Sequence, residues 1–206
     1  MTSKISGLAV GFAILVSALG LGLLENRLTV LRADDSEWDS PHIAPYVPTP
    51  HEVVSRMLEL AEIKPGDVLY DLGSGDGRIV VAAAKKFGIR AVGFEIDPVL
   101  VKDSRQIIKQ AGLEELVEIR EQDIRTVDFS PATVVTMYLY PAANLRLRPV
   151  LMRELKPGSR VISHDFNMGS WKPDRVERLQ DTAGLSRTIY RWRIADRAGA
   201  DLPAYR

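Results

Sequence analysis

YDLGSGDGR, residues 70–78, is the part of the sequence that is most informative about the fold. It joins a short apolar run, residues 67–71, to the amphipathic run RIVVAAAKKF, residues 78–87, and the two indicate a strand, a turn and a helix. Glycines let the backbone turn with positive φ and approach a ligand closely. The free amides at the start of the helix favour an anionic group. The stretch therefore predicts a ligand-binding loop after a buried strand.

Strand-like and helix-like segments alternate along the rest of the chain. Predicted helices lie at residues 51–62, 78–87, 98–111 and 145–155, predicted strands at 67–71, 91–94, 116–120, 132–139 and 160–166, and a predicted antiparallel pair at 176–180 and 188–194. This alternation indicates a parallel sheet with helices on both faces. The predicted fold class is α/β, a doubly wound, mostly parallel Rossmann-like sheet with an antiparallel C-terminal ribbon. Ligands of such sheets bind beyond the carboxyl ends of the strands.

The composition excludes several classes of function. The chain has 206 residues, of which 46% are hydrophobic and 26% charged, so one core of ordinary size is expected. Lys plus Arg and Asp plus Glu both number 27, and a net charge of zero argues against a general nucleic-acid binder. There is no cysteine, and the three histidines match no zinc-site spacing. We therefore expect neither a nucleic-acid partner nor a metal.

The amino-terminal part of the chain predicts a separate segment. Residues 5–24 contain no ionisable side chain, and as a helix they would span about 30 Å, the thickness of a bilayer core. A membrane anchor is predicted, with a cleaved signal peptide and export as the alternative. Residues 25–50 are rich in acids and prolines and predict a linker. The domain assignment is thus 1–24 anchor or signal, 25–50 linker and 51–206 one folded domain.

Three carboxylates follow three successive predicted strands and suggest a ligand. They are Asp71, Glu95 and Asp123, and they could accept hydrogen bonds from an amino group, a ribose and an adenine. S-adenosylmethionine has all three groups. A dinucleotide is the competitor, but its G-x-G-x-x-G/A motif needs a small sixth residue where this chain has Arg78. Asp71 and Asp76 would also repel a pyrophosphate.

Four segments of the chain resemble a known family. DLGSGDGR is similar to the first motif of class I, seven-strand S-adenosylmethionine-dependent methyltransferases. More narrowly, residues 46–49 (YVPT), 70–84, 93–101 and 171–174 (WKPD) resemble the family of the ATP synthase c-subunit lysine N-methyltransferase and its prokaryotic relatives. In that family a hydrophobic segment precedes the catalytic domain. The resemblance implies a membrane-anchored methyltransferase whose catalytic domain faces the cytoplasm, where the cofactor is.

The resemblance also assigns residues to the cofactor. Asp71 and the glycine-loop backbone would bind its methionine end, Glu95 its ribose and Asp123 its adenine. Ile96 and Ile124 would flank the adenine ring, and the YVPT segment would cover the cofactor and shape substrate access. For Tyr46 the alternative is an aromatic ring packed in the linker. The complete set assigned to the cofactor is Tyr46, Pro48, Thr49, Asp71, Gly73, Ser74, Gly75, Gly77, Glu95, Ile96, Asp123 and Ile124.

Three residues are candidates for the acceptor side. Many related enzymes carry an Asn/Asp-Pro-Pro-Tyr/Phe motif after the fourth strand, whereas this chain has MYLYP at residues 137–141. Tyr138 is the first candidate, and its alternative role is packing beside the cofactor. His164 is a candidate base or substrate contact, or else a strand-end histidine bonded to a backbone carbonyl. Trp171 either forms a wall of an amine pocket or caps the core.

The predicted function follows from these assignments. A lysine amine must lose a proton before it attacks a methyl group, and its ordinary pKa of about 10.4 makes this costly at neutral pH. A desolvated pocket with aromatic walls lowers that pKa. We expect an S-adenosylmethionine-dependent methyltransferase that acts near the membrane on a protein lysine, with a lysine of a membrane protein as one candidate acceptor. The alternatives are a small-molecule methyltransferase and a scaffold protein that keeps the cofactor pocket without turnover.

Overall fold

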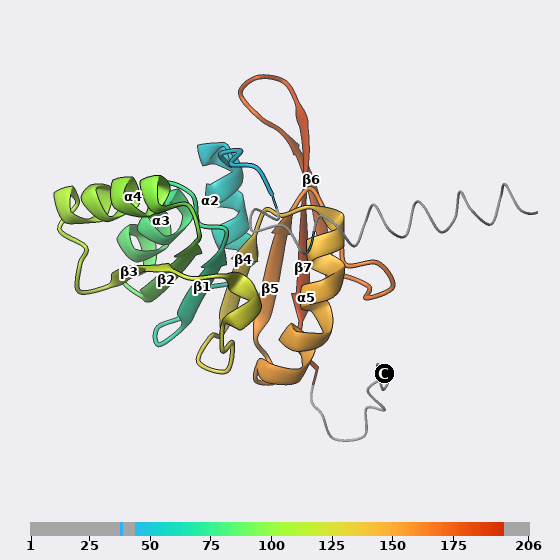
Figure 1. Ribbon diagram of the computed structural model, residues 1–206. Coiled ribbons are helices and arrows are strands. Elements are labelled where there is room, and N and C mark those ends of the chain that lie inside the picture. Colours follow the sequence, from blue (N-terminus) through green and yellow to red (C-terminus); the bar gives the residue numbers. More distant parts are fainter. Residues whose placement is uncertain (1–37, 39–43, 196–206) are drawn as a thin grey trace, which may run out of the picture. The chain divides into compact units, whose positions relative to one another are not determined.

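The computed structural model describes residue 38 and residues 44–195 (Figure 1). The strands are β1 Val68–Leu72, β2 Arg90–Glu95, β3 Val117–Glu121, β4 Val134–Met137, β5 Arg160–His164, β6 Arg175–Gln180 and β7 Ser186–Arg193. Among the described residues, the helices of eight or more residues are α2 His51–Leu60, α3 Arg78–Phe87, α4 Pro98–Gln110 and α5 Pro141–Glu154, and η1 Ile124–Thr126 is a single 3-10 turn.

Within the described residues the strands form one seven-stranded sheet in the order β3-β2-β1-β4-β5-β7-β6. The first five strands are parallel, and β7 is antiparallel to both β5 and β6. The chain moves outward from β1 to β3 and then returns to place β4 on the other side of β1. This reversal is the switch point beside which such sheets bind ligands. The predicted mostly parallel sheet with an antiparallel C-terminal ribbon is confirmed.

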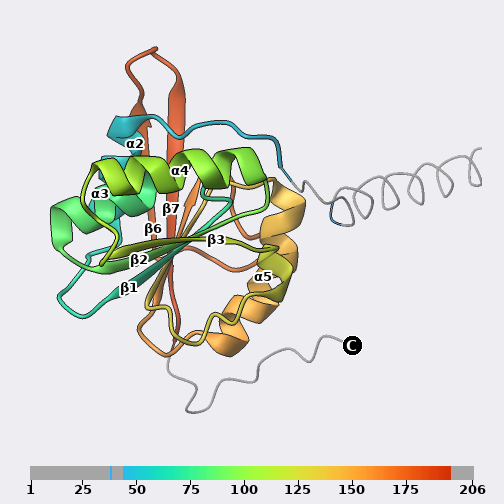
Figure 2. The same ribbon diagram turned by 60° about the vertical axis from the view of Figure 1, so that its left-hand side comes forward.

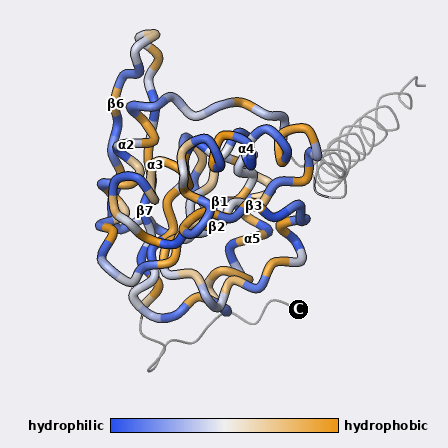
Figure 3. The backbone as a smooth tube through the Cα atoms, turned by 90° about the vertical axis from the view of Figure 1, so that its left-hand side faces the viewer, coloured by the Kyte–Doolittle hydropathy of each residue, from blue (hydrophilic) through white to orange (hydrophobic). Residues whose placement is uncertain are grey.

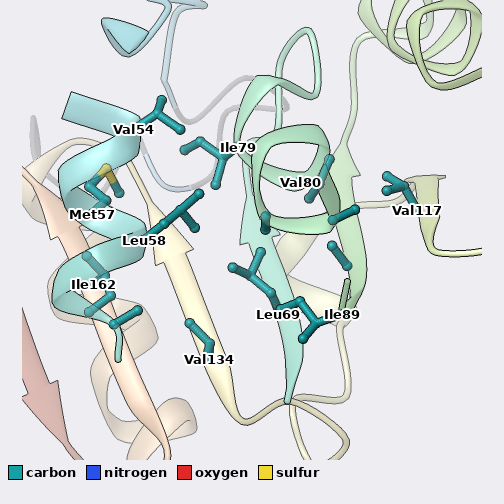
Figure 4. Packing of buried hydrophobic residues seen from close by; sticks show 14 of the residues in the cluster. Val54, Met57, Leu58, Leu69, Ile79, Val80, Ile89, Val117, Val134 and Ile162 are labelled. Carbon is teal, nitrogen blue, oxygen red and sulfur yellow. The ribbon is translucent and has the colours of Figure 1, made fainter. Parts of the chain in front are cut away.

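Successive side chains along each strand point to opposite faces of the sheet, so a hydrophobic core forms on each face. Leu69, Val134 and Ile162 belong to the cluster that α2, α3 and α4 cover (Figure 4). Their neighbours Tyr70 and Val135 are also buried and point to the opposite face, because successive strand residues alternate. Figure 2 shows α2, α3 and α4 on one side of the sheet and α5 on the other. Helices on both faces leave the carboxyl ends of the parallel strands to the loops.

The start of α4 is fixed by a side-chain cap. The Asp97 carboxylate accepts hydrogen bonds from the amides of Val99 and Leu100 at 2.8 and 3.4 Å, which satisfies donors that the helix leaves free. Pro98 at the first position has no amide to satisfy. Figure 3 shows hydrophobic and hydrophilic stretches alternating along α4, and Val101 is buried. The cap therefore begins α4 directly after the end of β2.

Two predicted boundaries after β4 and β5 are wrong. The strand predicted at 132–139 covers only Val134–Met137, because its pairing with β1 and β5 stops at Met137. The next helix begins at Pro141 rather than at residue 145, since proline suits the first helical position. The strand predicted at 160–166 ends at His164, where Asp165 adopts a left-handed φ of 58°. Residues 138–140 and 165–166 therefore lie outside the strands, in loops at the carboxyl end of the sheet.

The predicted location in a membrane, with the catalytic domain facing the cytoplasm, is wrong for the part of the chain that the structure describes. None of the helices there is both long and apolar enough to cross a bilayer. The longest of them, α5, has 14 residues and spans about 21 Å, against a bilayer core of about 30 Å. The segment 5–24, on which the anchor and its signal-peptide alternative rest, lies outside the described residues.

A buried ion pair fixes the amino end of the sheet. Arg160 of β5 bonds the Asp67 carboxylate before β1, and both side chains are almost fully buried. Arg160 Nε also donates to the Ala61 carbonyl at 2.9 Å. Thr133 Oγ1 and the Lys64 amide donate to the same carboxylate at 2.7 Å each. The network ties α2 and its following turn to the central strands.

We predict that Arg160→Met lowers the free energy of unfolding by about 3–5 kcal/mol, because it leaves the Asp67 charge buried without its partner. Denaturant unfolding followed by circular dichroism measures the change. Adding Asp67→Asn to the same protein should recover part of the loss, since the uncompensated charge is then gone. An Arg160→Met protein as stable as the parent would contradict this account.

Candidate functional site

The pocket lies at the carboxyl ends of the parallel strands, beside the switch point. Its lining comes from the strap (residues 44–50, which precede α2), from the loops after β1, β2 and β3, and from residues 138–139 after β4. Figure 2 shows the strap as a blue coil that leads into α2. All residues that the sequence assigns to the cofactor line this pocket except Gly77, and so does Tyr138. Gly77 instead faces Ser104 of α4.

Glu95 holds the glycine loop in place. Its Oε2 accepts a hydrogen bond from the Gly75 amide at 2.8 Å, and its Oε1 accepts from the amides of Ile96 and Asp97 at 2.8 and 3.0 Å. One half-buried carboxylate thus joins the loop after β1 to the loop after β2. A carboxylate has about four acceptor directions, so one direction on Oε2 stays available for a ligand.

At two positions only glycine fits, because a neighbouring side chain lies where a Cβ atom would be. A Cβ on Gly93 of β2 would lie 2.3 Å from Ser74 Oγ, so only glycine lets the loop rest on the neighbouring strand. A Cβ on Gly75 would lie 2.5 Å from Cε2 of Tyr46, and Gly75 also has a φ of 56°. The Tyr46 ring therefore occupies the space above the loop that any side chain at position 75 would fill.

Asp71 is a buried acid at the end of β1. The Thr136 hydroxyl donates to its Oδ1 at 2.7 Å. Burial raises the pKa of Asp71 to about 7, against the opposing effect of the hydrogen bond from Thr136. The nearby Glu95 carboxylate raises this pKa further. The folded protein therefore holds a charge here that it would be more stable without, which is typical of functional sites.

Two further acids of the pocket, Asp123 and Asp76, are held by arginines. The Asp123 carboxylate accepts from the Arg125 amide at 2.9 Å and pairs with the Arg125 guanidinium; these hydrogen bonds and this charge keep the pKa of Asp123 below its usual value. Asp76 pairs with Arg78 at 2.6 Å. Arg78 Nη1 also donates to the Thr49 carbonyl at 2.8 Å. Arg78 therefore ties the strap to the glycine loop, a role that the sequence did not indicate.

The acceptor candidates have different surroundings. Tyr138 lines the pocket, and its ring centroid lies 3.9 Å from that of His164. His164 is fully buried behind Tyr138 and is not part of the lining. Burial lowers the pKa of His164 to about 4, although the Asp165 charge opposes this effect. Trp171 is also outside the lining; its ring centroid is 5.6 Å from that of Trp192, and its carbonyl accepts the Trp192 indole hydrogen bond.

The charge of the pocket is strongly biased toward acids. Its described lining contains five carboxylates and one guanidinium, namely Asp71, Asp76, Glu95, Asp97 and Asp123 against Arg78. The ammonium group, the ribose hydroxyls and the adenine amino group of S-adenosylmethionine are all hydrogen-bond donors. A pocket that offers carboxylates at three neighbouring strand ends fits this set of donors.

Comparison with known proteins identifies the family. The family described as ANTKMT methyltransferase domain matches residues 71–175. A protein-lysine N-methyltransferase of Saccharolobus islandicus (strain REY15A) is 43% identical over 157 residues, which cover 76% of this chain and 96% of that protein. The human lysine N-methyltransferase named for the ATP synthase c-subunit is 38% identical over 159 residues, 75% of this chain and 67% of that protein. The chain belongs to the ANTKMT methyltransferase family.

A solved structure supports the cofactor. The chain is 54% identical to an RNA methyltransferase from Salinibacter ruber in complex with S-adenosyl-L-homocysteine, with a TM-score of 0.69 over 77% of this chain and 100% of that one. The tRNA methyltransferase TrmK of B. subtilis shares the fold at 16% identity, with a TM-score of 0.61 over 74% of this chain and 69% of that one. This ANTKMT-family protein is an S-adenosylmethionine-dependent methyltransferase, and the predicted fold family, enzyme class and cofactor are confirmed.

We predict that Asp71→Asn stabilises the protein without cofactor at high pH. The folded-state pKa of Asp71 is raised from 3.8 to about 7. Between these two pH values the folded protein keeps a proton on Asp71 that the unfolded chain has lost. Above pH 7 the buried Asp71 carboxylate is charged, and this charge destabilises the folded state. The difference corresponds to roughly 4 kcal/mol at most. Melting temperatures should favour the variant at pH 8, and its advantage should shrink as the pH falls from 7 toward 4. An advantage that does not change with pH would contradict the raised pKa.

Proposed function

We propose that this methyltransferase transfers a methyl group to the side-chain amine of a lysine in a protein. The observation that carries the proposal is the excess of carboxylates over guanidinium groups in the pocket lining. A cationic lysine side chain is attracted to a pocket of this charge, whereas the phosphates of a nucleic acid are repelled. Two relatives, each of which this chain matches over at least two thirds of that relative's length, are named lysine N-methyltransferases.

The cofactor is held, in this proposal, by the acids at the strand ends. Asp71 takes the ammonium of the methionine part, Glu95 a ribose hydroxyl through the remaining direction on Oε2, and Asp123 the adenine amino group. Ile96 and Ile124, which also line the pocket, flank the adenine. The strap covers these groups and excludes water from them, because Tyr46 already lies against the loop. When bound, S-adenosylmethionine supplies an electrophilic methyl group on a sulfonium.

The acceptor amine is placed against Tyr138. Burial and the nearby Asp165 charge raise the pKa of the Tyr138 hydroxyl, so the hydroxyl stays protonated at neutral pH and can accept a hydrogen bond from the amine. The half-buried ring also keeps water from the amine, which lowers the cost of losing its proton. His164 is a poor base for this step, since its pKa of about 4 is far below that of a lysine. In this proposal the residues of the pocket catalyse the transfer by aligning the acceptor amine with the methyl group and by keeping water away from the amine.

The function is tested with the full chain, S-adenosylmethionine carrying a labelled methyl group, and a panel of lysine-rich proteins. Mass spectrometry of digests should place the label on lysine amines. An equal panel of transcribed RNAs and of small amines tests the other acceptor classes. Label that appears on RNA or on small amines alone would overturn the proposal, and absence of transfer to any acceptor by a protein that binds the cofactor would favour the scaffold.

We predict that Tyr138→Phe lowers kcat by about tenfold, because it removes one hydrogen bond to the acceptor and keeps the ring. Tyr138→Ala should lose more, since the wall itself is removed. Cofactor affinity, measured by calorimetry, should stay near that of the parent in the Phe variant.

The matched control is Tyr140→Phe, because Tyr140 is exposed and outside the pocket lining. It should leave both kcat and cofactor affinity unchanged. Undiminished methylation by Tyr138→Ala would remove Tyr138 from the acceptor site.

A further inference from the structure

His164 connects the two walls of the pocket from behind. It is the last residue of β5 and is completely buried. Its Nδ1 lies 3.3 Å from Thr49 Oγ1 of the strap, 115 positions earlier in the chain. Its ring lies against the Tyr138 ring, with centroids 3.9 Å apart. One side chain therefore contacts both the segment that covers the cofactor pocket and the wall assigned to the acceptor.

The surroundings of the two ring nitrogens select one tautomer. His164 Nε2 lies 3.4 Å from Asp165 Oδ2 and has no aligned hydrogen-bond partner among the described residues. A nitrogen lone pair facing a carboxylate is repelled, so Nε2 carries the proton and Nδ1 carries the lone pair. The Thr49 hydroxyl then donates to Nδ1. Nδ1 thus receives the Thr49 hydroxyl proton in a hydrogen bond and Nε2 already carries a proton, so neither nitrogen can take a proton from a substrate.

Asp165 is itself held firmly from the C-terminal ribbon. Its backbone is in the left-handed region, with a φ of 58°. The Thr188 amide donates to Oδ1 at 2.8 Å, and Arg187 Nη1 lies 3.3 Å from Oδ2. Arg187 Nε also donates to the buried Asp181 carboxylate at 2.8 Å. The charged groups that face His164 are thus fixed by β7, and the polar chain runs from the ribbon through His164 to the strap.

We propose that His164 is a positioning residue of the methyl-transfer site, which holds Thr49 through a hydrogen bond and Tyr138 through ring contact. The strap over the cofactor and the wall for the acceptor are thereby fixed in one arrangement. The part that concerns Tyr138 rests on the proposed function, and the part that concerns the strap does not. The buried histidine remains neutral near neutral pH, because its pKa is lowered to about 4 by burial.

Two substitutions separate the two contacts. His164→Phe keeps a flat ring against Tyr138 and removes the partner of the Thr49 hydroxyl. It should weaken cofactor binding about threefold to tenfold, the effect of one lost neutral hydrogen bond, and change kcat at saturating cofactor little. His164→Asn places an amide near the position of Nδ1 and removes the ring. It should keep cofactor affinity and lower kcat.

The strap side is tested independently with Thr49→Val and Thr49→Ser. Valine keeps the shape and removes the hydroxyl, so its loss of cofactor affinity should equal that of His164→Phe. Serine should restore affinity. If the two residues act through their mutual hydrogen bond, the double variant Thr49→Val/His164→Phe binds no more weakly than His164→Phe alone. Thr182→Val, at the exposed turn between β6 and β7, is the matched control and should bind as the parent does.

Calorimetry with S-adenosylmethionine, kinetics at saturating cofactor and melting temperatures are measured for all variants. The proposed role of the Thr49–His164 hydrogen bond would be overturned if the losses of cofactor affinity multiply in the double variant, or if Thr49→Val binds the cofactor as tightly as the parent. Equal kcat in His164→Asn and the parent would overturn the Tyr138 contact. Should His164→Phe fail to fold, the Thr49→Val and Thr49→Ser pair still decides the strap contact. The affinity results need no acceptor, so they stand apart from a failure to methylate lysine.

Discussion

The carboxylate of Glu95 is the constraint on which the cofactor side of the pocket depends. It ends β2 and receives the amide of Gly75 from the loop after β1 and two amides from its own loop. Without it, Gly75 would leave a buried donor unsatisfied, which costs about 1–3 kcal/mol. The glycine loop is also pressed onto Gly93 of the same strand. Two neighbouring strand ends are thereby fixed before any ligand binds, as preorganisation requires.

The same region carries a charge that destabilises the empty protein. Asp71 is buried beside two other carboxylates, and its pKa is raised to about 7 in consequence. A ligand with a positive charge and several donors removes this penalty, because it pairs with the acids that the fold brings together. The acids that the fold brings together therefore cause both the repulsion in the empty pocket and the affinity for the cofactor. The strap completes the enclosure through Tyr46 over the loop and through Arg78, which bonds the Thr49 carbonyl.

The sequence predicted the sheet and the glycine loop, and of the residues that it assigned to the cofactor all but Gly77 line the pocket. Those features depend on local periodicity and on strand ends that parallel topology brings together. It misplaced the start of α5, since Pro141 and the tyrosines before it gave no periodic signal. It also gave no sign that Arg78 bonds the strap or that Thr136 bonds Asp71. Those contacts join residues 29 and 65 positions apart, and only the folded chain brings them together.

We propose that the carboxylates at the strand ends, Glu95 above all, bind S-adenosylmethionine in an acidic pocket that rejects dinucleotides. The most direct measurement is a calorimetric titration of S-adenosylmethionine and of NAD into the full chain and into its Glu95→Gln variant. We predict micromolar binding of the first ligand by the parent, at least tenfold weaker binding by the variant, and no binding of NAD by either. Equal affinity of parent and variant for S-adenosylmethionine, or binding of NAD, would contradict the account.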